Sequence, residues 1–285
     1  MNKTKLCVIG DPIEHSLSPV IHNTILELSG LPFVYGRVQV NAGDAEAFLC
    51  KAEQEGYGGF NATMPHKTDL VPLMDELDTD AQLYQAVNTV VLRDGKRYGC
   101  NTDGLGFLKM LEDAGVSVEG KTIAVLGAGG AAGAVVLKMA QAGAARIFVC
   151  SRTLQKAERL AELFPGQITP CAFEKQTISD CALFSDLLVN ATPLGMTGVE
   201  EGFSSFGFLR SLPKQAPVCD LIYDPAETEL LRAAGELGHP TINGLGMLIH
   251  QAMFALEHFT GMEIDREAML PKVEAALKKA MKNNI

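Results

Sequence analysis

The stretch "NATMPHK", residues 61–67, gathers several reactive side chains at the end of a strand-like run. It follows Gly58-Gly59-Phe60 and carries an amide, a hydroxyl, a proline and, at Lys67, an amine. Amides and hydroxyls both donate and accept hydrogen bonds, and an amine can carry a proton to or from a reacting oxygen. Lys67 is therefore either a surface charge or a proton carrier, and only the rest of the chain distinguishes the two.

A glycine-rich turn, "GAGGAA" at 127–132, fits the pattern G-x-G-x-x-A directly after an apolar strand and at the opening of a helix. Gly127 permits the tight turn, Gly129 lets the backbone approach a pyrophosphate, and Ala132 allows close helix packing. The phosphate would lie at the helix N-terminus, where free N–H groups and the helix dipole favour an anion. We predict a dinucleotide site here.

The end of the next strand indicates which dinucleotide binds. An NAD site usually places Asp or Glu there to hold the ribose 2′-hydroxyl. This chain instead has "SRT" at 151–153, followed by Lys156. Hydroxyls and cations suit a 2′-phosphate, whereas a carboxylate would repel it. Arg152 and Lys156 also fit solvated charges at a helix start, but cations there oppose the dipole unless an anion is bound. NADP is the predicted cofactor.

These residues need elements to position them, and the chain alternates short apolar strands with helical patterns, which predicts an α/β fold. Ser18 is expected to cap a helix over 18–30, and Asp44 a helix over 44–56. Residues 87–103 predict a hairpin turning at Asp94-Gly95. We expect two α/β domains: a substrate-binding domain at 1–103 and a Rossmann-type NADP-binding domain at 104–244, with C-terminal helices at 245–285 packing back on the first.

Composition excludes several classes of partner. The 285 residues carry a net charge of −10, which argues against nucleic acid and anionic membrane. No run is long and apolar enough for a secretory signal or a membrane span. Seven cysteines without a CxxC pair fit reduced thiols in a cytoplasmic protein, and six histidines lack zinc-site spacing, so no metal is expected. The predicted partner is a small molecule, and the expected assembly is a monomer or a homodimer.

Eight stretches in order then resemble the shikimate dehydrogenase family, within the wider shikimate/quinate dehydrogenase superfamily. They span residues 10 to 251: "GDPIEHSLSPVIHN", "NATMPHK", "AVNTV", "GCNTDGLG", "GAGGAA", "NATPLGM", "DLIYDPAETELL" and "NGLGMLIHQ". The resemblance implies reversible reduction of 3-dehydroshikimate to shikimate with NADPH, in chorismate and aromatic amino-acid biosynthesis. It also implies a catalytic pair, Lys67 and Asp103.

The resemblance assigns the remaining site residues by position in these motifs. The implied substrate-binding residues are Ser16, Ser18, Thr63, Lys67, Asn88, Asp103, Tyr223 and Gln251. The implied cofactor-binding residues are Gly127, Ala128, Gly129, Gly130, Ala131, Ser151, Arg152, Thr153, Lys156, Leu221 and Gly244.

The residue types make chemical sense for such a ligand. Shikimate is a ring with several hydroxyls and one carboxylate. Hydroxyl donors at Ser16, Ser18 and Tyr223 suit the carboxylate, while mixed donor–acceptor groups suit the ring hydroxyls. A purely structural role is the alternative for two of these residues, because Ser18 and Asp103 can both serve as helix caps. A relaxed quinate/shikimate dehydrogenase needs more room near the carboxylate. A non-catalytic NADPH sensor would be expected to lose Lys67 or Asp103, and this chain has both.

Overall fold

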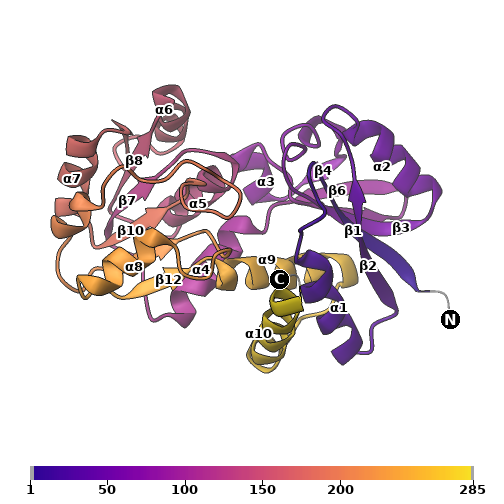
Figure 1. Ribbon diagram of the computed structural model, residues 1–285. Coiled ribbons are helices and arrows are strands. Elements are labelled where there is room, and N and C mark those ends of the chain that lie inside the picture. The colour runs from indigo at the N-terminus through magenta and orange to yellow at the C-terminus, as the bar shows by residue number, and fades with distance from the viewer. Residues whose placement is uncertain (1–2, 284–285) are drawn as a thin grey trace. The chain divides into compact units, whose positions relative to one another are not determined.

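The computed structural model describes residues 3–283, which form two compact units. One unit combines the chain up to Gly106 with the chain from Ile249 onward, and the other is Phe107–Leu248. Each unit contains a six-stranded sheet covered by helices (Figure 1). The predicted α/β class is confirmed.

The sheet of the first unit is mixed, in the order β2-β1-β3-β5-β6-β4. Strand β1 runs parallel to β2 and β3, while β5 is antiparallel to both β3 and β6. The carboxyl ends of β1, β3 and β6 and the start of β5 therefore meet at one edge. The strands are β1 (Thr4–Gly10), β2 (Phe33–Gln39), β3 (Tyr57–Ala62), β4 (Glu76–Leu77), β5 (Thr89–Arg93) and β6 (Lys96–Cys100).

Helices close both faces of this sheet. On one face, Phe48 and Leu49 of α2 pack with Phe60 of β3 in a buried apolar cluster. On the other, α1 packs against α10, and Gly59 leaves room for Phe259 of α9, whose ring a Cβ would approach to 2.7 Å. The helices are α1 (Ser18–Leu28), α2 (Ala45–Gln54), η1 (Val71–Leu73), α3 (Thr79–Tyr84), α9 (Leu245–Thr260) and α10 (Arg266–Asn283).

The sheet of the second unit is entirely parallel, in the order β12-β11-β10-β7-β8-β9. Renumbered from β7, this is the 3-2-1-4-5-6 order of Rossmann folds, with its switch point between β7 and β10. The strands are β7 (Thr122–Leu126), β8 (Arg146–Ser151), β9 (Ile168–Ala172), β10 (Leu187–Asn190), β11 (Val218–Asp220) and β12 (Thr241–Asn243). The helices are α4 (Asp103–Asp113), α5 (Gly130–Gln141), α6 (Leu154–Leu163), α7 (Lys175–Leu183), η2 (Gly207–Arg210) and α8 (Glu229–Glu236).

The predicted hairpin turn is confirmed, whereas the predicted helix caps at Ser18 and Asp44 differ from the structure. The hairpin turns at Asp94-Gly95 as predicted, with φ values of 54° and 71° that suit a tight two-residue turn. Ser18 is not the N-cap of α1: Leu17 occupies that position, and the Ser18 N–H donates to Ser16 Oγ at 3.3 Å. Asp44 is the N-cap residue of α2, but its side chain makes no capping bond. No helix within the described residues has the length and apolarity that a membrane crossing needs.

Candidate active site

The substrate-side candidates of the first unit come from segments that meet at one sheet edge. The Ser16 and Ser18 segment follows β1, Thr63 and Lys67 follow β3, Asn88 directly precedes β5, and Asp103 follows β6. The registers Ile9↔Ala62, Asn61↔Thr89 and Thr89↔Cys100 bring these strand ends level with one another. The mixed direction of the sheet thus gathers groups spread over about ninety residues of sequence.

Lys67 and Asp103 form a close ion pair. Lys67 Nζ donates to Asp103 Oδ2 at 2.6 Å, and the side chains are only 20% and 9% exposed. The other carboxylate oxygen, Oδ1, accepts from Asn88 Nδ2 at 2.8 Å. Each oxygen of Asp103 therefore has a donor, and the amine lies where solvent still reaches it. In this arrangement the amine can exchange a proton with a ligand bound beside it.

The amide of Asn88 is fixed in one orientation. Its Oδ1 accepts from the Thr102 N–H at 3.0 Å and from Thr89 Oγ1 at 2.8 Å. A backbone N–H can only donate, so the amide oxygen must face Thr102 and the NH₂ group must face Asp103. Asn88 is 2% exposed, so turning the amide over would leave buried groups unpaired.

A second layer of buried polar groups supports Asn88 and was not foreseen from the sequence. Asn61 Nδ2 donates to the backbone carbonyl oxygen of Asn88 at 3.1 Å and to Thr89 Oγ1 at 2.9 Å. Tyr35 Oη donates to Asn61 Oδ1 at 2.7 Å, and the Tyr35 ring stacks on His22 with centroids 3.9 Å apart. The available signal was the repetition of Asn near Thr at three strand ends, in "NAT" at 61–63 and in "NT" at 88–89 and 101–102.

The segment after β1 that carries Ser16 and Ser18 begins in contact with Thr63. A Cβ on Gly10 would lie 2.5 Å from Thr63 Cγ2, and the Asp11 N–H donates to the Met64 carbonyl at 3.0 Å. Glycine is therefore required where β1 turns into this segment. Ser16 and Ser18 are both partly buried.

The other two substrate candidates lie elsewhere in the fold. Gln251 is on α9 in the same unit and is half-buried. Tyr223 belongs to the second unit, where it follows β11. Burial, with a smaller effect of the Asp224 charge, raises the pKa of Tyr223, so its hydroxyl is a hydrogen-bond donor at neutral pH.

The glycine turn of the second unit has the geometry that a pyrophosphate needs. Gly127 has φ of 109°, and a Cβ there would lie 2.9 Å from the Ala191 carbonyl oxygen, at the switch point between β7 and β10. Gly129 is the N-cap of α5 and has no side-chain capping bond, and a Cβ on it would meet only open space. The exposed backbone of residues 129–131 is thus free to approach an anion at the N-terminus of α5.

The segment after β8 presents a cation that already binds a carboxylate. Arg152 Nη1 lies 2.9 Å from Glu201 Oε2, with both side chains about two-thirds exposed, at 65% and 67%. Ser151 is buried, and its Oγ donates to the Thr153 carbonyl and accepts from the Thr153 N–H. Lys156 is exposed. A guanidinium held by an exposed carboxylate is chemically suited to exchange that anion for a phosphate.

The structure also brings Leu221 and Gly244 together. The Gly244 N–H donates to the Ile222 carbonyl at 3.0 Å, and a Cβ on Gly244 would lie 2.0 Å from the Leu221 carbonyl oxygen. Only glycine fits there. Three features are compatible with a bound dinucleotide: the hydrogen-bond donors at the end of β8 and after it, the glycine turn at Gly127, and the backbone contact between Leu221 and Gly244.

A buried polar group that the sequence did not reveal joins β10 to β11. Asn190 Nδ2 donates to Asp220 Oδ1 at 2.9 Å, and Thr228 Oγ1 donates to Asp220 Oδ2 at 2.7 Å. Burial raises the pKa of Asp220, and the hydrogen bonds from Thr228, the Ile222 N–H and Asn190 oppose the rise. This group fixes the ends of two strands next to the switch point.

A Rossmann-type sheet with a dinucleotide turn, joined to a second α/β unit with an amine–carboxylate pair, defines the class of dinucleotide-dependent oxidoreductases. Three family models match the chain. They are the shikimate dehydrogenase substrate binding domain over residues 8–90, shikimate / quinate 5-dehydrogenase over 109–195, and the shikimate 5′-dehydrogenase C-terminal domain over 244–274.

Individual relatives agree over nearly the full length. A shikimate dehydrogenase (NADP(+)) from Alkaliphilus oremlandii is 41% identical over 272 residues, covering 93% of this chain and 95% of that protein. A crystal structure of a shikimate dehydrogenase in complex with NADP+ superposes with a TM-score of 0.85 at 36% identity, covering 97% and 96% of the two chains. Shikimate 5-dehydrogenase from Listeria monocytogenes, in complex with shikimate and NAD, has a TM-score of 0.85 at 31% identity, covering 95% and 96%.

The chain belongs to the shikimate dehydrogenase family. The predictions of the family and of the NADP-dependent oxidoreductase class are confirmed.

Proposed function

We propose that this protein catalyses the NADPH-dependent, reversible reduction of 3-dehydroshikimate to shikimate, as a step in chorismate and aromatic amino-acid biosynthesis. The observation that carries the proposal is the Lys67–Asp103 pair, held by Asn88 at the sheet edge of the first unit. Family membership supports the substrate class, and the Lys67–Asp103 contact supports the role of Lys67 as proton donor.

In the reduction direction, Lys67 donates its proton to the substrate oxygen that becomes a hydroxyl. NADPH, when bound, supplies the hydride to the carbon of that carbonyl group. Asp103 keeps the ammonium aimed through the 2.6 Å contact and offsets its positive charge until the proton has left. In the oxidation direction the same amine takes the proton from the hydroxyl group.

The remaining groups would bind and orient the ligands. We assign the ring hydroxyls to Thr63, Asn88, Asp103 and Gln251, and the carboxylate to Ser16, Ser18 and Tyr223. Each unmet hydrogen bond in a buried site costs about 1–3 kcal/mol, so an analogue lacking one ring hydroxyl would be disfavoured. The dinucleotide would be held by Gly127, Ala128, Gly129, Gly130, Ala131, Leu221 and Gly244, and its 2′-phosphate by Ser151, Arg152, Thr153 and Lys156.

The decisive experiment is a spectrophotometric assay of NADP+ reduction with shikimate, with quinate and without substrate, repeated with NAD+. We expect turnover with shikimate and NADP+. Quinate oxidation at comparable kcat/KM would instead make the protein a quinate/shikimate dehydrogenase. The absence of turnover with either substrate would favour a cofactor-binding sensor.

A lysine variant then tests the proposed mechanism. Lys67→Met should lower kcat by about 10²–10⁴-fold with a smaller change in substrate KM, because loss of a general acid–base acts mainly on the transition state. Lys96→Met is the matched control: Lys96 also forms an ion pair in this unit, at 2.7 Å to Glu76, but both side chains are 54% exposed. Near wild-type turnover of Lys67→Met would remove Lys67 from the mechanism.

We place the reaction in the cytoplasm and expect a monomer or a homodimer. The seven cysteines are all free thiols, and Cys171 and Cys181, with sulfurs 3.7 Å apart, form no disulfide, which suits a reducing compartment. Size-exclusion chromatography with light scattering measures the assembly, and a mass of four subunits or more would contradict this expectation.

A further inference from the structure

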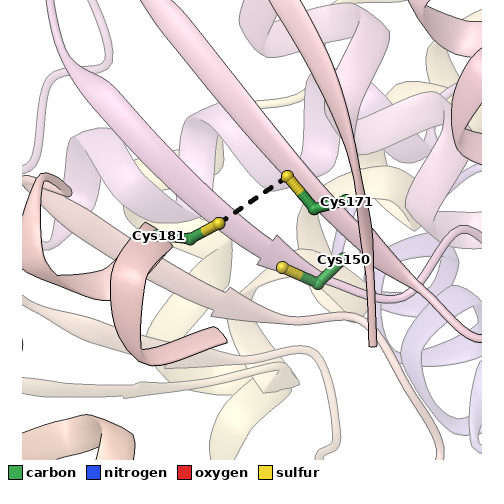
Figure 2. A group of neighbouring side chains, drawn as sticks. All are labelled: Cys150, Cys171 and Cys181. Atoms are coloured by element: carbon green, nitrogen blue, oxygen red, sulfur yellow. Dashed lines mark hydrogen bonds between the residues drawn. The ribbon is translucent and has the colours of Figure 1, made fainter. Parts of the chain in front are cut away.

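Three cysteine side chains of the second unit converge on one point. Cys150 of β8 and Cys171 of β9 are register partners on neighbouring strands, and Cys181 comes from α7, which packs on both strands. The three sulfurs all lie within 4.8 Å of one another, and Cys181 Sγ lies 3.7 Å from Cys171 Sγ (Figure 2). The proposed dehydrogenase mechanism uses none of them.

The sulfur spacing matches metal coordination better than a disulfide. Two thiolates bound at about 2.3 Å to a tetrahedral cation lie about 3.8 Å apart, and about 4.0 Å apart around a trigonal one. The Cys171–Cys181 distance of 3.7 Å is close to both values, and the other two sulfur pairs lie within 4.8 Å. A disulfide would need the two sulfurs at about 2.05 Å and would leave the third cysteine unused.

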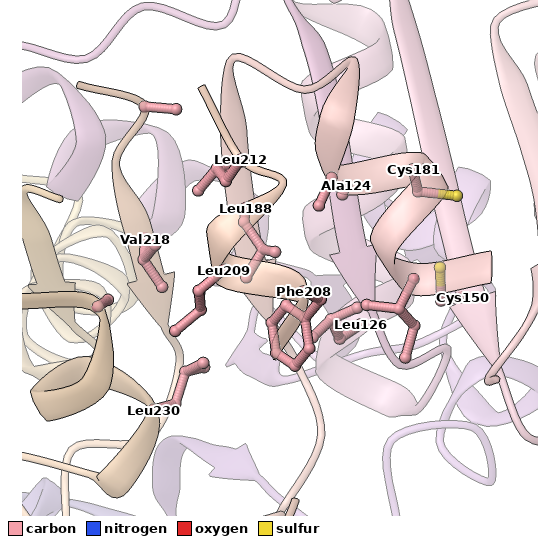
Figure 3. Packing of buried hydrophobic residues seen from close by; sticks show 14 of the residues in the cluster. Ala124, Leu126, Cys150, Cys181, Leu188, Phe208, Leu209, Leu212, Val218 and Leu230 are labelled. Carbon is pink, nitrogen blue, oxygen red and sulfur yellow. The ribbon is translucent and has the colours of Figure 1, made fainter. Parts of the chain in front are cut away.

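The surroundings of the three sulfurs are largely apolar. Cys150 and Cys181 are part of the cluster that packs α7, η2 and α8 on the sheet, near Leu126 and Phe208 (Figure 3). Cys171 is only half-buried. The hydrophobic shell around a metal site controls solvent access and the local dielectric.

The three side chains of the cluster offer only sulfur as a ligand. Thiolate is the form that binds metal. Within the described residues, no histidine or carboxylate joins the three sulfurs, so a cation would be three-coordinate or would take a solvent ligand.

We propose that Cys150, Cys171 and Cys181 form a binding site for a soft d¹⁰ cation, Zn²⁺ or Cu⁺. Thiolate ligands select these ions over Mg²⁺ and Ca²⁺, which prefer oxygen. A bound cation cancels part of the negative charge of the thiolates in an apolar setting, and it ties β8, β9 and α7 together.

The test uses the full-length protein, reduced and stripped with chelator. Zn²⁺ is titrated in competition with a chromophoric chelator, and Cu⁺ against a Cu⁺-specific chelator under anaerobic conditions. We expect one equivalent of at least one of these ions to bind, and Mg²⁺ not to compete. Cys171→Ser should weaken the binding by more than about 100-fold, the upper end of what losing an outer-shell partner costs. Cys219→Ser, at a buried cysteine outside the cluster, should leave the affinity unchanged.

A second readout is independent of the titration. The cation should raise the Tm of the wild type and of Cys219→Ser, because it binds the folded state, and should not raise that of Cys171→Ser. Since Cys171 is the most exposed of the three, its serine variant is the one expected to fold, and circular dichroism verifies this. Failure of both ions to bind, or equal binding by Cys171→Ser, would overturn the proposal and leave the cysteines as buried apolar side chains. Oxidation to a Cys171–Cys181 disulfide without metal uptake by the reduced protein would also overturn it.

Discussion

The ion pair between Arg152 and Glu201 leads to paired predictions of opposite sign. If Arg152 binds the 2′-phosphate of NADP, Glu201 competes with the cofactor for the same guanidinium. Arg152→Ala should raise the KM for NADP+ by roughly one to two orders of magnitude, because charge-assisted hydrogen bonds contribute about 1.5–3 kcal/mol. Glu201→Gln should lower the same KM. NAD+ has no phosphate at that position, so its KM should respond to neither change.

The size of the Glu201 effect follows from the exposure of the pair. The Arg152–Glu201 contact is 2.9 Å, but the side chains are 65% and 67% exposed, so it belongs with surface ion pairs worth about 0.2–1 kcal/mol. Removing this competitor should lower the KM for NADP+ by about 1.4–5-fold. In the double variant Arg152→Ala/Glu201→Gln the gain should disappear, since Glu201 would then have no guanidinium to occupy.

The assay is initial-rate kinetics at saturating shikimate, with NADP+ and NAD+ varied in turn. Glu200→Gln is the control for the charge of Glu201, because it removes the same charge from the neighbouring exposed residue. Arg159→Ala is the control for Arg152, since it removes an exposed arginine from α6. If Arg152→Ala raises the KM for NADP+ and the KM for NAD+ alike, the assignment of the 2′-phosphate to this segment is wrong. If Glu200→Gln lowers the KM as much as Glu201→Gln, long-range charge explains the gain and the ion pair does not.

Three further predictions concern buried contacts. Tyr35→Phe removes the hydroxyl that donates to Asn61 Oδ1, so it should lower the free energy of unfolding by about 1–3 kcal/mol in urea titrations. A variant as stable as the wild type would contradict the hydrogen bond. Gly244→Ala would place a Cβ 2.0 Å from the Leu221 carbonyl oxygen, so it should lower the free energy of unfolding by roughly 1–3 kcal/mol and raise the KM for NADP+. An unchanged KM would show that this backbone contact does not affect cofactor binding. Burial lowers the pKa of His22 from 6.5 to about 3, so the fold holds it neutral while the unfolded chain protonates it below about pH 6.5. His22 should therefore make the free energy of unfolding fall from pH 6.5 toward pH 3 by up to about 1.4 kcal/mol per pH unit. In unfolding titrations across that range, the free energy of unfolding of His22→Phe should depend less steeply on pH than that of the wild type.

Much of the fold follows from local sequence patterns. The alternation of strands and helices, the Asp94-Gly95 turn and the strand–glycine–helix unit at Gly127 each depend on a few neighbouring residues, and each is present. The short strands β9 and β12 were not foreseen. "ITPCA" contains a proline and lies at a sheet edge, while "TIN" has only three residues, too few for a periodicity to show.

The site was predictable only in part, because its support is long-range. Asn61, Thr89 and Thr102 are ordinary polar residues in sequence, and they act on Asn88 only through the register of β3, β5 and β6. The misplaced cap at Ser18 has a different, local cause. Leu17 takes the N-cap position without a side-chain capping bond, while the Ser16 hydroxyl accepts from the Ser18 N–H, a contact that propensity at Ser18 does not reveal.

The division of the chain into units has a consequence for synthesis on the ribosome. The second unit, Phe107–Leu248, is one uninterrupted segment, whereas the first needs the chain up to Gly106 and the chain from Ile249. Although N-terminal domains generally fold first during translation, α1 must here wait for α10 to emerge. The parallel sheet with its glycine turn should therefore complete its fold before the sheet edge that carries Lys67 is fully supported. A nascent chain arrested once Leu248 has cleared the exit tunnel should bind NADP+ before the substrate-binding unit resists protease.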